Sequence, residues 1–488
     1  MVDPAFLNYP ANPIKAVQDT PGRGGEMSAV TWITTPMPTP MESNMLWQAV
    51  NQALGTTLKM TIVAQADYAV TLPTILAGQD LPDIIYIGST VVIPQLPTFF
   101  KSKMADLGPY LSGDGIKDYP NLANIPTIAW RQMVFDNTLY GIPRSNSMYL
   151  WAHWVQQDLL DAEGLSDPRT ADEYKQLATH FTRPDQSLYG LGVENNEGMG
   201  TLNGWLTGIF GTPNTWALDK SSGKLTHAIE TDQFRAAVSY GRDLWSAGAY
   251  DPDALQYNLV SARNQFAARR FVFRMDSFLT GAPELFWATA TQRDPPGNPR
   301  VLGAFPATAG GTPTFWATTG ILGYCVIKQA PPERVKEILR VLDWLASPFG
   351  SQEYLLRNYG LEDQHWTPDA NGNPVLTDRG KADSTVPYNY LIRAPAALYW
   401  PQTPQNTPIM HDAETALYPY MSIDPTIGFY SPTNASKLPS LTRDLNDKLN
   451  DIIVGRQPFE ALDQAISEWR GAGGDQIRTE FQQAVTSG

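Results

Sequence analysis

Short apolar runs alternate with helix-like segments near the start of the chain. Strands are predicted at residues 29–33, 58–63 and 84–87, and helices at residues 70–77 and from residue 45, with Gly55 as the stop. This order predicts an α/β fold with a mostly parallel sheet. Ligands of such sheets bind beyond the carboxyl ends of the strands. We therefore expect residues 34–35 and 88–89 to border a ligand cleft, with room for the ligand at Gly88, and Asp80 and Asp83 to be turn and cap residues.

Less regular patterning follows the first strands. Thr170 and Glu173 have the spacing of a helix capping box, and Asn371–Gly372 is typical of a hairpin turn. Residues 394–439 contain many prolines and predict a loop-rich tract. Further helices are predicted at residues 151–163, 231–247, 332–345, 441–455 and 458–485, and further strands at residues 271–275, 301–305 and 321–327.

Composition and charge exclude several classes of protein. The chain has 488 residues, enough for two or three domains, and a net charge of −14 without a basic run, which argues against nucleic acid as a partner. No uninterrupted apolar window is long enough for a transmembrane helix, and the start lacks a secretory signal, so we expect that an original signal was removed. The single cysteine, Cys325, excludes an internal disulfide and a multi-cysteine zinc site, and its apolar neighbours predict a buried thiol.

Aromatic residues are the most informative part of the composition. The chain contains 14 Trp, 21 Tyr and 18 Phe, which together make 11% of its residues. Several tryptophans lie in loops rich in Gly, Pro and Asn, which points to a ligand surface: Trp205, Trp216, Trp287, Trp316, Trp366 and Trp400. Others lie at helical spacing among apolar residues and are assigned to the core: Trp47, Trp245, Trp344 and Trp469.

Catalytic patterns are weak. None of the five histidines pairs with another at zinc-ligand spacing, and the chain has no P-loop and no G-x-S-x-G elbow. Glu194 and Glu197 are the obvious candidates for a glycosidase pair, although a solvated polar loop is the favoured interpretation. The stretch DANGN at residues 369–373 lacks the closing Glu of a calcium loop and favours a hairpin.

Several stretches, taken together and in order, resemble the extracellular solute-binding proteins of ABC transporters, family 1. The first is AGQDLPDIIYIG at residues 77–88, and the second is LYGIPRSNSMYLWAHWVQQDLLDAEGLSDPRTADEYKQLATHFT at residues 139–182. Residues 244–252 and 271–278 resemble a later helix and the strand that enters the binding cleft. VLDWLASPFGSQEYLLRNYGLEDQHWTPDANGNPV and EWRGAGGDQIRTEFQQA are similar to the lipoprotein-like subgroup of larger carbohydrate binders.

The resemblance implies a two-lobed periplasmic-binding-protein-like α/β fold, with a hinge and a ligand cleft between the lobes. Lobe one is expected at residues 1–142 and 304–345, and lobe two at residues 143–303 and 346–488. The chain departs from the family in two places. It carries no lipid-anchored Cys near its start, and residues 184–190 are too short for the calcium loop of some members. No metal and no cofactor is therefore expected.

Candidate ligand-binding residues follow from strand ends, expected lobe crossings and loop aromatics. Sugar recognition needs aromatic faces for the C–H faces of pyranose rings and planar polar groups for the hydroxyls. Hydrogen-bonding candidates are Thr34, Asn44, Ser89, Arg144, Asn146 and Asp276, and aromatic candidates are Trp151, Trp205, Phe278, Trp287, Trp316 and Trp400. For Asn44 a helix cap and for Arg144 a structural ion pair are equally favoured alternatives.

The resemblance implies the extracytoplasmic substrate-binding component of an ABC importer, either a cell-surface lipoprotein or a periplasmic protein, that binds an oligosaccharide. Its expected partners are the carbohydrate and the permease subunits, and it is expected to be a monomer without catalytic residues. The few basic residues in the chosen loops favour a neutral glycan. Two alternatives stay open: a glycoside hydrolase, which would release sugar, and a sugar-sensing protein that serves a signalling receptor.

Overall fold

The computed structural model describes residues 2–34, 36–78, 80–88, 91–93, 95–149, 151–194, 205–279 and 281–487. Contacts between residues divide the chain into two compact units. We call them lobe one, formed by Pro4–Ser147 and Thr319–Pro404, and lobe two, formed by Met148–Thr318, Gln405–Gly488 and the short segment Met1–Asp3. The crossings after Ser147 and after Thr318 therefore fall beyond the expected boundaries at residues 142 and 303.

The expected division is wrong for residues 346–404, which belong to lobe one. In this stretch α14 (Gln352–Tyr359) packs against α1 (Met45–Leu54), and α16 (Tyr388–Leu391) packs against the strands of the lobe-one sheet. These contacts join elements that are far apart in sequence. Local sequence patterns do not predict such contacts, and therefore do not predict the lobe to which these residues belong.

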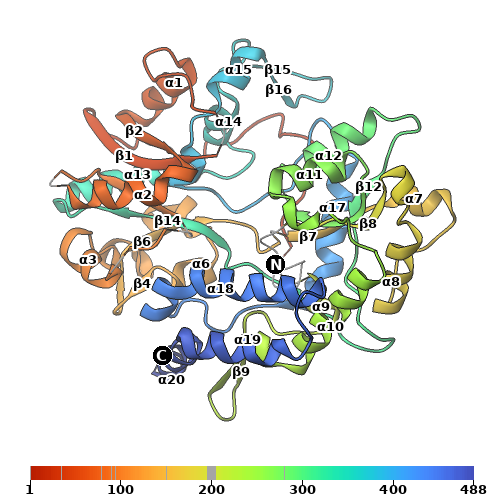
Figure 1. Cartoon of the computed structure of the whole chain (residues 1–488). Helices are drawn as coiled ribbons and strands as arrows, with labels where there is room; N and C mark the ends of the chain where they lie inside the picture. Colours follow the sequence, from red (N-terminus) through yellow and green to blue (C-terminus); the bar gives the residue numbers. More distant parts are fainter. Residues whose placement is uncertain are drawn as a thin grey trace. The chain divides into compact units, whose positions relative to one another are not determined.

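The described strands of lobe one form a sheet in the order β2-β1-β3-β14-β6. They are β1 (Glu26–Ile33), β2 (Thr57–Ala64), β3 (Ile84–Gly88), β6 (Gly141–Ser145) and β14 (Ile321–Ile327). β1 is parallel to β2, beside it in Figure 1, and to β3, as predicted, whereas β14 is antiparallel to β3 and β6. The ends of β1, β3 and β6 consequently lie at one edge of the sheet.

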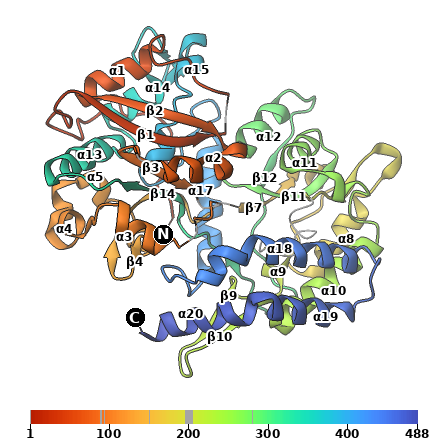
Figure 2. The same cartoon turned by 60° about the vertical axis from the view of Figure 1, so that its left-hand side comes forward.

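Helices and two small hairpins surround this sheet. The remaining helices of lobe one are α2 (Gln65–Ala77), α3 (Leu96–Lys103), α4 (Gly108–Leu111), α5 (Pro120–Ala123), α6 (Thr127–Arg131), α13 (Pro332–Leu345) and α15 (Asp378–Asp383). The hairpins pair β4 (Val134–Phe135) with β5 (Thr138–Leu139) and β15 (Trp366–Pro368) with β16 (Pro374–Leu376). The second hairpin confirms the turn predicted at Asn371–Gly372. α13 has the predicted bounds and packs against α5 (Figure 2).

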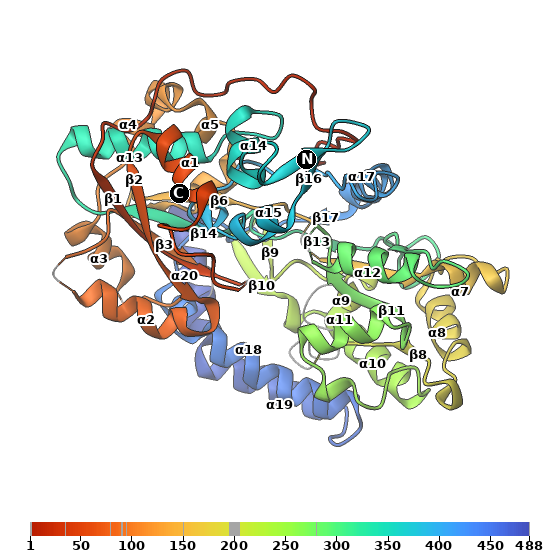
Figure 3. The same cartoon turned by 90° about the horizontal axis from the view of Figure 1, so that it is seen from above.

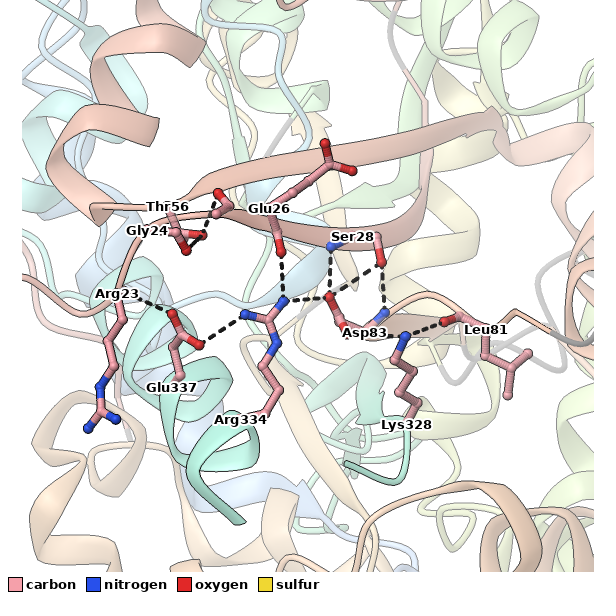
Figure 4. Close-up of polar contacts among 11 residues, drawn as sticks. Arg23, Gly24, Glu26, Ser28, Thr56, Leu81, Asp83, Lys328, Arg334 and Glu337 are labelled. Atoms are coloured by element: carbon pink, nitrogen blue, oxygen red, sulfur yellow. Dashed lines mark hydrogen bonds and ion pairs between the residues drawn. The ribbon is translucent and has the colours of Figure 1, made fainter. Parts of the chain in front are cut away.

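Asp83 fixes the start of β3 through its carboxylate (Figure 4). Oδ2 accepts hydrogen bonds from the Ser28 backbone N–H at 3.0 Å and from Arg334 Nη2 at 2.8 Å, and Oδ1 lies 3.3 Å from Lys328 Nζ. Burial alone raises the pKa of Asp83, but the bonds from Ser28 and Arg334 outweigh it and hold that pKa below its usual value. Asp83 is therefore an ion-pair centre that ties β3 to β1 and α13, and not a simple turn residue as expected.

Lobe two has its own sheet, whose described strands run in the order β12-β7-β11-β8. They are β7 (Trp151–Gln156), β8 (Tyr189–Leu191), β11 (Phe271–Ser277) and β12 (Pro299–Val301). The helix expected from residue 151 is wrong for its first six positions, because β7 is a strand and α7 begins at Gln157. β7 lies between β11 and β12 and has buried apolar residues on both faces, Ala152 and Trp154 on one and Val155 on the other, so its sequence shows no strict alternation.

The helices of lobe two carry most of its core. They are α7 (Gln157–Ala162), α8 (Ala171–His180), α9 (Trp205–Ile209), α10 (Asp232–Ser246), α11 (Leu259–Ala267), α12 (Ala282–Thr291), α17 (Asn406–Leu417), α18 (Pro432–Ile453), α19 (Ala461–Trp469) and α20 (Asp475–Ser487). α17 and the first turns of α18 lie in the tract expected to be loop, although each contains a proline. α18 packs along α19 (Figure 3), and the core includes Tyr174, Phe234, Leu449 and Trp469.

Single-residue expectations for the core are largely confirmed. Trp47, Trp344 and Trp469 are buried, and Trp245 is half-buried against the core of lobe two. Cys325 is fully buried, its thiol donates to the Leu391 carbonyl at 2.9 Å, and burial raises its pKa. Among the described helices, none combines the length and the hydrophobicity that crossing a bilayer requires.

Candidate functional site

An apolar pocket opens in lobe two at the end of its sheet. Its volume is about 570 Å³, including the part that is open to solvent. The described residues that line it are Trp151, Ala152, His153, Trp205, Gly208, Ile209, Met275, Leu302, Gly303, Ala304, Phe305, Pro313, Thr314, Phe315, Trp316 and Leu417. Three of the tryptophans predicted to bind ligand thus meet at one place.

Each tryptophan comes from a different element. Trp151 begins β7, Trp205 begins α9, and Trp316 lies in β13 (Phe315–Trp316). The indole N–H of Trp316 donates to the Thr212 carbonyl at 3.0 Å, which fixes the ring. All three side chains are half-buried, so each keeps part of its aromatic surface accessible at the pocket.

His153 supports one of these rings. Its imidazole stacks on Trp205 with ring centroids 4.2 Å apart and an interplanar angle of 8°, and its Nε2 shares a hydrogen bond of 2.9 Å with the Tyr174 hydroxyl. Burial lowers the pKa of His153 to about 3, so the ring is neutral at neutral pH. The sequence analysis missed His153, although recognition of β7 as a strand would have placed it on the same face as Trp151.

Two buried polar atoms at the pocket lack a hydrogen bond. They are Nδ1 of His153 and Nε1 of Trp205, for which the described part of the chain supplies no partner. A buried polar group left unsatisfied costs about 1–3 kcal/mol. A polar group of a bound ligand that reached these atoms would recover that cost.

The outer wall of the pocket is held by backbone pairing. β13 pairs in parallel with β17 (Met421–Ser422), and the Asn214 side-chain amide donates to the Ala317 carbonyl at 2.7 Å and to the Ser422 carbonyl at 2.8 Å. Gly208 of α9 lies so close to the Thr314 carbonyl that a Cβ atom would overlap it. These contacts fix the wall that carries Phe315 and Trp316.

Charge is absent from the described lining of the pocket. None of the described lining residues is Asp, Glu, Lys or Arg, and its one titratable ring, that of His153, is neutral. Recognition at this pocket therefore rests on aromatic faces and neutral polar groups.

Asp276, expected to bind ligand, belongs instead to a buried ion-pair cluster on β11. Its carboxylate accepts from Arg263 Nη2 at 2.6 Å and from Arg274 Nε at 2.9 Å, and Arg274 Nη2 lies 3.6 Å from Glu194. The side chains of Asp276 and Arg274 are fully buried. The expectation for Asp276 is corrected because two guanidinium groups already occupy its carboxylate. Glu197 lies outside the described residues.

Two further aromatic candidates of lobe two are core residues. Phe278 is fully buried and packs against Tyr149, with ring centroids 6.0 Å apart. Trp287 is buried against Trp154 and donates its indole N–H to the Pro299 carbonyl at 3.2 Å. Neither lines the pocket, so the structure does not bring them together with Trp151, Trp205 and Trp316.

In lobe one, the polar candidates near the ends of β1 and β6 contact other groups of that lobe. Thr34 Oγ1 and the Tyr390 hydroxyl share a hydrogen bond of 2.7 Å, and Arg144 donates from Nε to the Asn389 carbonyl at 2.7 Å. Arg144 Nη1 also donates to the Asn146 side-chain carbonyl at 3.4 Å. Burial lowers the pKa of Arg144 to about 9. We call this set of residues the strand-end cluster.

The remaining candidates of lobe one have structural roles or lie outside the description. Asn44 is buried, caps α1 by accepting from the Trp47 N–H at 2.8 Å, and donates to the Asp383 carbonyl, so its amide is not free for a ligand. Trp400 is buried just before the crossing into lobe two. Ser89 and Thr35 lie outside the described residues.

Gly88 has a different purpose from the one expected. A Cβ atom at this position would overlap the Trp32 ring, which packs edge-on against Tyr68 and Tyr86. The glycine therefore makes room for a core tryptophan and not for a ligand.

Comparisons with known proteins agree on the fold. No family model matches the chain. It is 22% identical over 446 residues to the polygalacturonan/rhamnogalacturonan-binding protein YtcQ of Bacillus subtilis (strain 168), covering 89% of this chain and 86% of that protein. It is 21% identical over 473 residues to lipoprotein LipO of the same organism, covering 92% of this chain and 90% of that protein.

Solved structures with the same architecture cover nearly the whole chain. An extracellular solute-binding protein from Bifidobacterium longum subsp. infantis aligns with a TM-score of 0.70 and 12% identity over 96% of this chain and 99% of that one. The Streptococcus pneumoniae ABC-transporter substrate-binding protein FusA, solved in complex with kestose, aligns with a TM-score of 0.66 and 17% identity over 95% of this chain and 99% of that one. The two-lobed α/β fold expected from the sequence is confirmed. In fold, the chain is similar over nearly its whole length to solute-binding proteins of ABC transporters.

Proposed function

We propose that this protein is the extracytoplasmic substrate-binding component of an ABC importer and that it binds a carbohydrate. The observation that carries the proposal is the meeting of Trp151, Trp205 and Trp316 around one pocket. Pyranose rings present apolar C–H faces, and exposed aromatic rings are the side chains that cover such faces. The relatives named above as binding a polysaccharide or kestose support the same class of ligand.

The pocket favours a neutral sugar. A uronate would bring a carboxylate into a site where no described lining residue carries a positive charge, and a buried charge without a partner is costly. His153 cannot supply that charge, because its pKa of about 3 keeps the ring neutral. Its Nδ1 and the indole N–H of Trp205 suit a hydroxyl or ring oxygen.

Binding without turnover is the second part of the proposal. Glycoside hydrolysis requires two carboxyl groups on either side of the scissile bond, and none lies among the described lining residues. Glu194, the described member of the candidate pair, faces Arg274 at 3.6 Å. The relatives reported above are named as binding proteins and a lipoprotein, which supports a non-enzymatic role.

A role in an ABC importer also implies which partners the protein has and where it is located. We propose that a monomer delivers its sugar to the permease subunits on the outer side of the membrane. The net charge of −14 disfavours nucleic acid as a partner. A role in sensing instead of transport would leave the sugar site unchanged.

A thermal-shift screen tests the proposal. Neutral and uronic oligosaccharides are added to the purified protein, and the medium is analysed for released sugar. A neutral ligand at a hundred times its Kd should raise Tm by about 3 °C, without hydrolysis products. Uronates that shift Tm more than neutral sugars would contradict the neutral ligand, and sugar release would contradict the binding role.

A matched pair of variants tests whether the ligand that shifts Tm binds at the pocket. Trp151→Ala should abolish most of the shift, because Trp151 lines the pocket. Trp245→Ala removes a half-buried tryptophan of lobe two that is not among the described lining residues, so it should lower Tm but keep the ligand-induced shift. Equal loss of the shift in both variants would contradict this location.

A further inference from the structure

Lobe one contains a buried arginine that has no acidic partner among the described residues. Arg357, in the last turn of α14, is 5% exposed. Its Nε and Nη1 atoms are buried, and the described part of the chain supplies no hydrogen-bond acceptor for either of them. No described Asp or Glu acts on its charge. Arginine side chains are rarely buried to this degree unless a group of opposite charge accompanies them.

The acidic residue on the same helix is already used by other groups. Glu353 lies one turn before Arg357 on α14, at the i, i+4 spacing of helical ion pairs. Its carboxylate instead accepts two backbone N–H groups, that of Ala16 at 3.0 Å and that of Val17 at 3.1 Å. The Tyr354 ring lies over the guanidinium group, 5.3 Å from Cζ, but an aromatic face accepts only weak hydrogen bonds. The charge and the two buried nitrogens of Arg357 are therefore left without a strong acceptor in the described chain.

Two further arginines add positive charge in the same part of lobe one. Arg393 follows α16, is half-buried, and is close enough to lower the pKa values of Arg357 and Arg144. Burial is the larger cause in both cases, and the pKa of Arg357 falls to about 10, so its side chain stays charged at neutral pH. The printed hydrogen bonds of Arg144 go to neutral acceptors, such as the Asn389 carbonyl. Positive charge therefore accumulates here, and no described carboxylate acts on either of the two buried arginines.

We propose that Arg357 and Arg393 hold a small inorganic anion, of the size of chloride, inside lobe one. The anion accepts hydrogen bonds from the buried nitrogens of Arg357 and reduces the repulsion among the three arginines. Because Arg357 is almost fully buried, a single-atom ion suits the position better than the carboxylate of a sugar. None of these arginines lines the lobe-two pocket, so the anion stabilises lobe one and is not the transported ligand.

Thermal unfolding in salts of defined composition tests the anion site. The purified protein is dialysed into a buffer whose anion is a bulky sulfonate, and sodium chloride then replaces the sulfonate salt at constant ionic strength. Chloride at a hundred times its Kd should raise the Tm of the wild type by about 3 °C. Arg357→Met, which keeps a long apolar side chain and removes the charge, should show no rise with chloride. In the chloride-free buffer it should be at least as stable as the wild type, because it removes an unpaired buried charge.

Two further variants separate binding at the site from a general effect of salt. Arg23→Met removes an arginine of lobe one that is 62% exposed and pairs with Glu333, and its Tm should rise with chloride as in the wild type. Arg393→Met changes a half-buried residue and should raise the Kd for chloride about 10-fold or more. It provides the measurement if Arg357→Met does not fold.

Sodium galacturonate is the second probe, because its carboxylate could also meet an arginine. A rise in Tm with galacturonate that disappears in Arg357→Met would overturn the inorganic anion in favour of a sugar carboxylate. The absence of a chloride effect in the wild type, or an equal effect in the wild type and Arg357→Met, would overturn the anion site altogether. The chloride titration contains no sugar, so neither of these two results bears on the proposed carbohydrate function.

Discussion

The pocket of lobe two and the strand-end cluster of lobe one were both expected to bind ligand, but they differ in how their side chains are used. The tryptophans of the pocket keep accessible faces, and two of its polar atoms lack partners in the described chain. In the cluster, Thr34 and Arg144 already have hydrogen-bond partners within lobe one. The two regions therefore differ in whether their polar groups already have hydrogen-bond partners and whether their aromatic faces are accessible.

The largest expected effect concerns the pocket. Trp205→Ala should weaken sugar binding about 50-fold or more, since tryptophans at binding sites often contribute over 2 kcal/mol. It should also lower the free energy of unfolding by about 3 kcal/mol, because the indole packs on His153 and Tyr174. Calorimetry and urea denaturation measure the two effects. Trp245→Ala is the control. A similar loss of affinity in that variant would show that the sugar does not bind specifically at the pocket.

The next effect concerns stability in lobe one. Asp83→Asn should cost about 2 kcal/mol of unfolding free energy and leave sugar affinity unchanged, because it breaks a buried ion pair with Arg334. The folded-state pKa of Asp83 is lowered, so its contribution is present above the unfolded pKa of about 3.9 and is lost as pH falls further. Asp114→Asn, at an exposed pair with Lys117, is the matched control and should change nothing measurable. Equal stability of the Asp83→Asn and wild-type proteins at pH 7 would contradict the role of Asp83.

A smaller effect concerns the pH dependence of stability that His153 causes, as distinct from the packing of its ring. The pKa of His153 is lowered to about 3, so its contribution to stability is present above the unfolded pKa of about 6.5 and is lost as pH falls toward 3. From pH 7.5 to pH 5 this should cost the wild type about 1–2 kcal/mol more than His153→Phe, which keeps an aromatic ring. Urea denaturation at both pH values measures the difference. Parallel pH profiles for the two proteins would show that His153 is not buried in its neutral form.

The smallest expected effect concerns the strand-end cluster of lobe one. Thr34→Ala removes an exposed hydrogen bond to Tyr390 and should change sugar affinity less than about 3-fold, with a stability cost below about 1 kcal/mol. A tenfold loss of affinity, measured by calorimetry, would contradict this difference between the two regions, because it would show that the strand-end cluster binds the sugar directly.

Much of the fold was predictable because local patterns agree with it. The strands near residues 29, 58, 84 and 321 appear within a few residues of their predicted bounds, and α13 has the bounds that Pro332 and the apolar period indicate. The prediction failed for β7 because apolar residues occur on both of its faces, and it failed for α17 because the surrounding tract is rich in proline. The lobe boundaries failed at residues 346–404 because long-range packing sets them.

The candidate site was predictable in part from its tryptophans. Trp205 and Trp316 have Gly-, Pro- or Asn-rich neighbours and Trp151 follows an expected lobe crossing, and the three residues line one pocket. Phe278, which the resemblance implies as a stacking residue beside Asp276, and Trp287, predicted from its loop-like neighbours, are core residues. The difference is the neighbour that covers each ring, such as Tyr149 over Phe278, and sequence does not encode that neighbour locally.

The place of β14 in the lobe-one sheet has a consequence for synthesis on the ribosome. β14 lies between β3 and β6, yet its residues follow the whole first segment of lobe two in the chain. Until Ile327 has emerged, the edges of β3 and β6 that face each other lack their shared partner. Domains generally fold as units during translation, with early segments first. In this chain the sheet of lobe one cannot be completed before β14 is synthesised, because β14 is the strand that joins β3 to β6.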